Sequence, residues 1–62
     1  MDGMTVDIQG IWGDRLQFHD VSSYERLECD SGEYLELLYT LGSESTTLTI
    51  LLMPRDVVTE IP

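Results

Sequence analysis

Apolar and polar residues alternate in short stretches of this chain, and turn residues separate the stretches. The first alternation covers residues 5 to 12, and a second begins after Gly13-Asp14. A period of two residues is typical of a half-buried strand. We predict a hairpin here, in which a three-residue loop, 13 to 15, places Trp12 and Leu16 on one face.

The next turn signal is Cys29-Asp30-Ser31-Gly32-Glu33, which resembles a type I turn followed by a glycine in the left-handed region. A three-residue loop at this point puts Leu27 opposite Leu35 on the core face. On the reverse face, the same register sets Arg26 opposite Glu36, which is a favourable cross-strand pair.

The third turn joins two leucine-rich stretches. They share one face only if the loop between them holds an even number of residues, and Gly42-Ser43-Glu44-Ser45 supplies four. Pro54 ends the strand that covers 46–53, because proline cannot donate to a ladder, and residues 57–61 form a short final strand. The predicted core face of this region consists of Leu35, Leu37, Tyr39, Leu41, Leu48, Ile50 and Leu52.

Composition also favours strands. The chain has no Ala and no Lys, which are among the best helix formers, and it has six Thr, four Val and four Ile. We predict an all-β fold, a small five-stranded meander or partly open barrel of the SH3-like roll type. The alternative is an α+β fold with a helix over residues 31–41, because Asp30 and Glu33 resemble a capping box and Gly42 a helix stop.

The length of 62 residues predicts one small domain, 1–62, with a marginal core. The usual staples of small domains are missing from the sequence. The single cysteine, Cys29, cannot form an intrachain disulfide, and the single histidine, His19, cannot belong to a four-ligand zinc set of His and Cys. We therefore expect self-association, with a homodimer as the simplest form.

Charge limits the classes of partner. Twelve Asp and Glu against three Arg give a net charge of -9, which repels nucleic-acid phosphates and anionic lipid. We expect neither direct nucleic-acid binding nor membrane binding. The acidity fits adaptation to a salt-rich cytoplasm, and the alternative is an acidic inhibitor or nucleic-acid mimic that blocks the basic face of a nucleic-acid-binding protein. No long apolar run or signal-peptide pattern is present, so the expected location is cytoplasmic.

The residues that carry chemistry form no catalytic or ligand motif. Ser22 and Ser23 follow His19 without the pattern of a nucleophile elbow. Cys29 lies between two acidic residues, and neighbouring negative charge disfavours the thiolate. We expect no enzymatic activity, no metal and no cofactor.

The clearest sign of binding is the second face of the predicted sheet. Once the core face is filled, apolar side chains are left pointing the other way, and exposed aromatic and Met side chains are typical of interfaces. The alternative is that the N-terminal hairpin covers this face and buries it. The predicted protein-binding residues are Tyr24, Tyr34, Leu38, Leu51, Met53 and Trp12.

Overall fold

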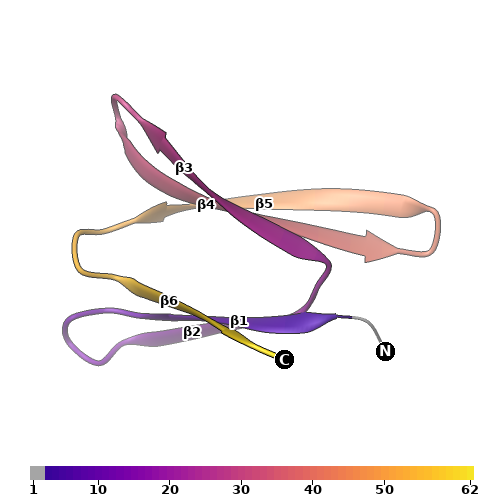
Figure 1. Cartoon of the computed structure of the whole chain (residues 1–62), viewed down its shortest axis with the longest axis horizontal. Coiled ribbons are helices and arrows are strands. Elements are labelled where there is room, and N and C mark those ends of the chain that lie inside the picture. The colour runs from indigo at the N-terminus through magenta and orange to yellow at the C-terminus, as the bar shows by residue number, and fades with distance from the viewer. Residues whose placement is uncertain (1–2) are drawn as a thin grey trace.

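The protein forms two three-stranded antiparallel sheets that face each other, with strand orders β2-β1-β6 and β3-β4-β5 (Figure 1). This computed structural model describes residues 3–62. The all-β prediction is confirmed, and the alternative α+β fold with a helix over 31–41 is wrong, because residues 32–41 form a strand. The strands are β1 (Met4–Gln9), β2 (Arg15–Val21), β3 (Ser23–Cys29), β4 (Gly32–Leu41), β5 (Glu44–Leu52) and β6 (Val57–Ile61).

The predicted five-stranded meander is wrong in two respects. Residues 3–62 form six strands, because the chain passes from one sheet to the other at Ser22, whose amide donates to the Leu38 carbonyl over 2.7 Å. In addition, β6 returns to pair with β1, so the strands divide into two sheets and do not close into a barrel. The end of β5 before Pro54 and the final strand over 57–61 are confirmed.

The first hairpin keeps the predicted parity with a longer loop. Ile8 lies opposite Leu16, so the loop comprises the five residues 10–14 rather than three. Within it, the Gly10 amide donates to the Asp14 carbonyl over 2.9 Å. Trp12 therefore belongs to the turn, and its predicted place beside Leu16 on the strand face is wrong.

A bulge in β2 lets both Phe18 and Val21, which are three residues apart, face the core. Val6 pairs with Phe18, and Met4 pairs with Val21, so β2 holds one extra residue between these pairs. Asp20 takes up the extra length with a positive φ of 60°. A Cβ on Gly3, the residue before β1, would lie 2.5 Å from the Asp20 Cα, so the chain needs a glycine at this point.

The second hairpin is shifted by one residue from the predicted register. Its connection is the two-residue turn Asp30-Ser31, so Leu27 lies opposite Tyr34 and Arg26 opposite Leu35. A shift of one residue exchanges the two faces of a strand. The predicted pairs of Leu27 with Leu35 and of Arg26 with Glu36 are therefore wrong.

Two side chains show the consequence of this shift. Tyr24 lies opposite the buried Leu37 and packs against the core, where its hydroxyl donates to Glu60 of β6 over 3.1 Å. Arg26 forms its ion pair with Glu33 instead, at 2.9 Å. One contact ties the two sheets together, and the other ties β3 to β4.

The third hairpin confirms the even parity, with the two-residue turn Gly42-Ser43 in place of four residues. Leu37 lies opposite Leu48, and Leu35 opposite Ile50, so the predicted members of this face do lie together. They are not all buried, however, because Leu41 and Leu48 are exposed. The turn of the β4–β5 hairpin extends past the strands of the first sheet (Figure 1).

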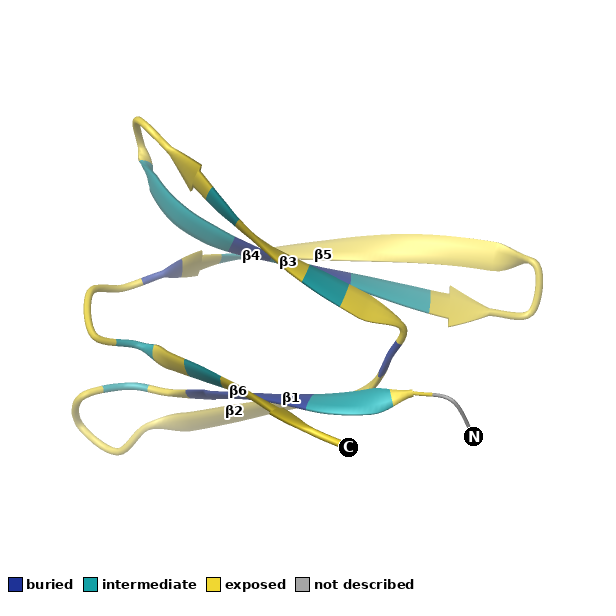
Figure 2. Ribbon diagram, viewed as in Figure 1, coloured by how far each residue is buried: buried dark blue, intermediate teal, exposed yellow. Residues whose placement is uncertain are grey.

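The core lies where the two sheets cross (Figure 2). Around it pack partly buried side chains that include Phe18, Tyr24 and Ile50. The buried apolar residues are Val6, Ile8, Val21, Leu35, Leu37 and Leu52. So small a core leaves large apolar side chains exposed at the periphery, and these define the candidate site.

Candidate protein-binding surface

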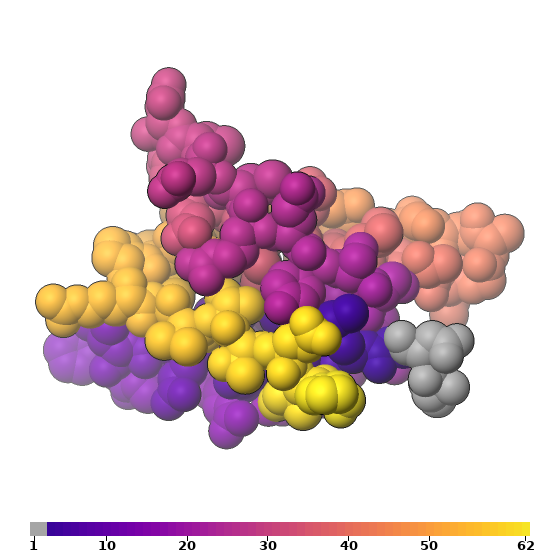
Figure 3. Space-filling view, in the orientation of Figure 1, coloured from indigo at the N-terminus to yellow at the C-terminus, as the bar shows by residue number. Residues whose placement is uncertain are grey.

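Two turns meet at one end of the molecule, the β1–β2 turn over 10–14 and the β5–β6 turn over 53–56. A Cβ on Gly10 would lie 3.4 Å from Asp56 Oδ1, which shows how closely the turns approach. In the space-filling view, the orange-yellow β5–β6 turn lies against the violet β1–β2 turn (Figure 3). Segments that are far apart in the sequence thus form one surface.

The β5–β6 turn is closed by its own hydrogen bonds. The Asp56 amide donates to the Met53 carbonyl over 3.1 Å, and Asp56 Oδ2 accepts from the Met53 amide over 2.9 Å. Pro54 and Arg55 occupy the two central positions, and Arg55 has a positive φ of 75°. Proline followed by a residue with positive φ is the arrangement of a type II turn. This turn holds Met53 and Pro54 in fixed positions.

We call the apolar surface formed by Ile11, Trp12, Met53 and Pro54 the end platform. Trp12 is 85% exposed and Met53 61% exposed, and all four residues line a groove of about 420 Å³. The acidic side chains of Asp14 and Asp56 lie at the same groove. Aromatic and Met side chains surrounded by polar groups have the composition of a protein interface.

The apolar surface continues from the end platform onto the outer face of the second sheet. A second groove shares residues 53–56 with the first and also includes Leu51, which is 51% exposed. On this outer face Leu51 lies beside Tyr34, and Leu27 lies on the other side of Tyr34. The register therefore forms an apolar row, Leu27-Tyr34-Leu51, next to the platform.

The predicted binding residues thus fall into three groups. Tyr34, Leu38 and Leu51 share the outer face, as predicted, although a row with Glu25 and Glu36 separates Leu38 from the other two. Trp12 and Met53 come together at the end platform.

The predicted place of Tyr24 on the reverse face is wrong, because the register turns its side chain toward the core. Burial and the nearby Glu60 carboxylate raise the pKa of the Tyr24 phenol. The prediction also missed Ile11 and Pro54, whose only signal was their place in turns beside Trp12 and Met53.

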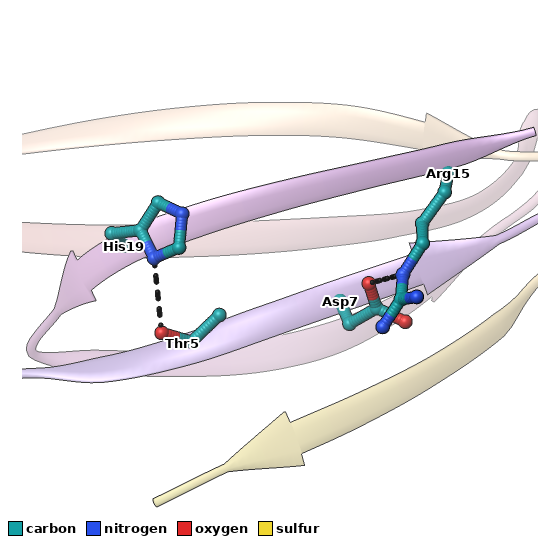
Figure 4. A network of polar contacts seen from close by, with 4 residues as sticks. All are labelled: Thr5, Asp7, Arg15 and His19. Carbon is teal, nitrogen blue, oxygen red and sulfur yellow. Dashed lines mark hydrogen bonds and ion pairs between the residues drawn. The ribbon is translucent and has the colours of Figure 1, made fainter.

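Polar side chains of β1 and β2 contact each other on the outer face of the first sheet (Figure 4). Arg15 donates to Asp7 over 2.7 Å, and Thr5 Oγ1 lies 3.1 Å from His19 Nδ1. The hydrogen bond from Arg15 holds the pKa of the Asp7 carboxyl below its usual value of 3.8, against the opposing effect of desolvation. Both contacts join β1 to β2, so they stabilise the hairpin.

The other candidate chemical groups lie apart. The Ser22 hydroxyl accepts from the Thr40 amide over 3.1 Å, and Cys29 is an exposed free thiol at the end of β3. Among residues 3–62, no three His, Cys, Asp or Glu side chains are grouped as metal ligands. The same part of the chain has no helix that could cross a lipid bilayer.

Comparisons with protein-family models, with curated proteins and with solved structures find no match for this chain.

Proposed function

We propose that the protein is a small non-enzymatic protein-binding module that associates with itself and engages a larger protein partner. The end platform carries this proposal. It presents a tryptophan that is 85% exposed beside an exposed methionine and a proline. Tryptophan is among the residues that most often dominate binding energy when a partner buries them.

The apolar area outside the core supports the same proposal. Leu41, Leu48, Leu51 and Val57 are exposed in addition to the platform. Burying a single Leu or Val side chain contributes about 1.5 to 3 kcal/mol. Association would bury apolar side chains that the small core of a single chain leaves exposed.

Sedimentation equilibrium at low and high salt tests self-association. We expect a dimer that persists or tightens as salt rises, because salt screens the repulsion between two chains of charge -9 while apolar contacts remain. A monomer at every concentration and both salt levels would refute this part of the proposal.

The larger partner is tested by capture with the wild-type chain and with Trp12→Ser, followed by titration of the purified partner. We expect Trp12→Ser to weaken binding at least tenfold and to leave the fold intact, because Trp12 contributes nothing to the core. Leu41→Ser is the matched control, because Leu41 is 86% exposed like Trp12 and lies at the end of β4 away from the platform. Equal affinity of the wild type and Trp12→Ser for the partner would show that the end platform is not the binding surface.

The second candidate is an acidic inhibitor of a nucleic-acid-binding protein. Glu25 and Glu36 lie directly opposite each other on the outer face of the second sheet. Like charges in this position repel, and a basic partner would relieve the repulsion. The affinity of such an inhibitor would fall steeply with added salt, whereas platform binding would not.

A cytoplasmic location belongs to this proposal, because the exposed thiol of Cys29 would stay reduced there. The SH3-like roll likewise stays a prediction, supported by two small antiparallel sheets packed face to face.

A further inference from the structure

The four edge strands differ in how they discourage pairing with another chain. The β2 edge is interrupted by the bulge at Asp20, and the β3 edge carries Glu25, Arg26 and Glu28. The β6 edge is five residues long and precedes Pro62. Bulges, charges, short length and proline are the usual protection of sheet edges.

The β5 edge has none of these devices. It extends over nine residues, ESTTLTILL, with Glu44 as its one charge, and its register against β4 is continuous. Threonine, isoleucine and leucine here form a surface well suited to strand pairing. A long edge of this kind is a template for another strand.

The hairpin geometry shows which backbone groups of β5 are free. Leu41 and Glu44 flank a two-residue turn, so they form the hydrogen-bonded pair nearest the turn. Hydrogen-bonded and non-hydrogen-bonded pairs alternate along an antiparallel ladder. The amides and carbonyls that point away from β4 are therefore those of Ser45, Thr47, Thr49 and Leu51.

We propose that the β5 edge pairs antiparallel with β5 of a second copy of this chain, about a two-fold axis at Leu48. This register sets Leu48 opposite Leu48 of the second copy and Thr47 opposite its Thr49. It satisfies the free backbone groups of both strands and joins the two copies into a continuous six-stranded sheet. The inference rests on the self-association in the proposed function and assigns the surface that performs it.

The position of the charges favours a second copy in this orientation. In the antiparallel pair each Glu44 lies opposite Leu52, and the two Glu44 side chains are about 27 Å apart along the strands. A parallel in-register pair would place them at neighbouring positions, about 4.8 Å apart. The strand is thus complementary to its own antiparallel copy.

Exposed apolar side chains on the same side of the molecule support this assignment. Leu48 of β5 is 42% exposed and Leu16 of β2 is 55% exposed, although both lie on the inner faces of their sheets. Figure 1 shows β2 and β5 as the pale strands farther from the viewer, so both edges lie on one side. A second copy at this side would cover the open seam between the sheets.

Cysteine cross-linking tests the register. In a Cys29→Ser background, Leu48→Cys should form a covalent dimer on oxidation, because residues opposite each other in a non-hydrogen-bonded pair have Cα atoms about 4.5 Å apart. Thr46→Cys is the matched control on the same face of the same strand. Its counterpart in the second copy would be about 14 Å away, beyond the reach of a disulfide.

Sedimentation equilibrium of Thr49→Pro and Thr49→Val tests the edge itself. Proline removes an outward-pointing amide and leaves the β4 ladder intact, so dimer affinity should fall about tenfold or more. Valine keeps the amide and should dimerise like the wild type. Circular dichroism confirms that each variant is folded, and the cross-linking result stands independently if Thr49→Pro does not fold.

The outcomes separate the two proposals. Suppose that the wild type dimerises, that Thr49→Pro dimerises equally well, and that Leu48→Cys cross-links no better than Thr46→Cys. These results would overturn the β5 assignment and leave self-association standing. A wild-type monomer at all concentrations would overturn self-association itself. Cross-linking specific to Leu48→Cys, with loss of dimer in a folded Thr49→Pro, would establish the edge pairing.

Discussion

Replacing Leu37 and Leu38 with alanine, one at a time, tests the division of β4 into a core face and an outer face. Leu37 is fully buried between the sheets, whereas its neighbour Leu38 is partly exposed on the outer face. Leu37→Ala removes buried methyl groups and leaves a cavity, which costs about 3 kcal/mol of unfolding free energy. Leu38→Ala loses only partial burial, and we expect about 1 kcal/mol or less.

These changes are large relative to the total stability. At about 0.05 to 0.15 kcal/mol per residue, a chain of 62 residues has an unfolding free energy of about 3 to 9 kcal/mol. Leu37→Ala should therefore remove a third or more of the stability, and at the lower end it should unfold the protein.

Urea denaturation followed by far-UV circular dichroism is the suitable assay. Fluorescence would report poorly, because the single tryptophan, Trp12, is exposed in a turn. All variants are measured at one protein concentration, since association shifts apparent stability. Equal costs for the two substitutions, or a larger cost for Leu38→Ala, would refute the assignment of these faces.

Three other predictions concern single contacts. Arg55→Gly should raise the unfolding free energy by about 0.5 kcal/mol, because glycine accepts the positive φ at this position without the strain of a side chain. Thermal melts of Arg55→Gly and of the control Arg55→Ala test this, and only the glycine variant should gain stability. The Asp7 carboxyl has a lowered pKa, so its contribution to the unfolding free energy is complete above pH 3.8 and is lost as pH falls through the folded-state pKa. The urea midpoint of Asp7→Asn should therefore decline less in acid than the urea midpoint of the wild type. The Tyr24 phenol has a raised pKa, so its contribution to the unfolding free energy is complete below pH 10.0 and is lost as pH rises through the folded-state pKa. Tyr24→Phe should be less stable than wild type at neutral pH, and its stability should decline less in alkali. An equal alkaline decline of the two proteins would contradict this prediction.

The sequence was sufficient to predict that the chain forms strands and that the leucines of the core face of β4 and β5 lie together, because alternation and loop parity depend on local geometry. The register of β3 could not be predicted in this way. Tyr24 and Leu27 are three residues apart, so a regular strand cannot place both on one face. Asp30-Ser31-Gly32 fits a loop of either two or three residues. In the observed register of β3, Tyr24 contacts Glu60, which lies far away in the sequence.

The candidate site shows the same limit. Trp12 and Met53 could be recognised as apolar side chains that a small core leaves exposed. Their meeting at one end depends on the approach of the two turns, which local sequence does not specify. The pairing of β6 with β1 brings these turns together, and that pairing is a long-range feature of the fold.

The two proposed surfaces have a joint consequence, because the end platform directly follows β5 in the chain. In an antiparallel pair centred on Leu48, the two Met53 residues lie ten strand positions apart, which corresponds to about 34 Å. The platforms would then be at opposite ends of the six-stranded sheet. Such a dimer is bivalent, and a partner with two suitably spaced sites would bind it more tightly than one site allows. Thr49→Pro should therefore weaken binding to a two-site partner and leave binding to an isolated single site unchanged, although it alters nothing in the platform. Equal loss at both kinds of partner would show that β5 itself contacts the partner.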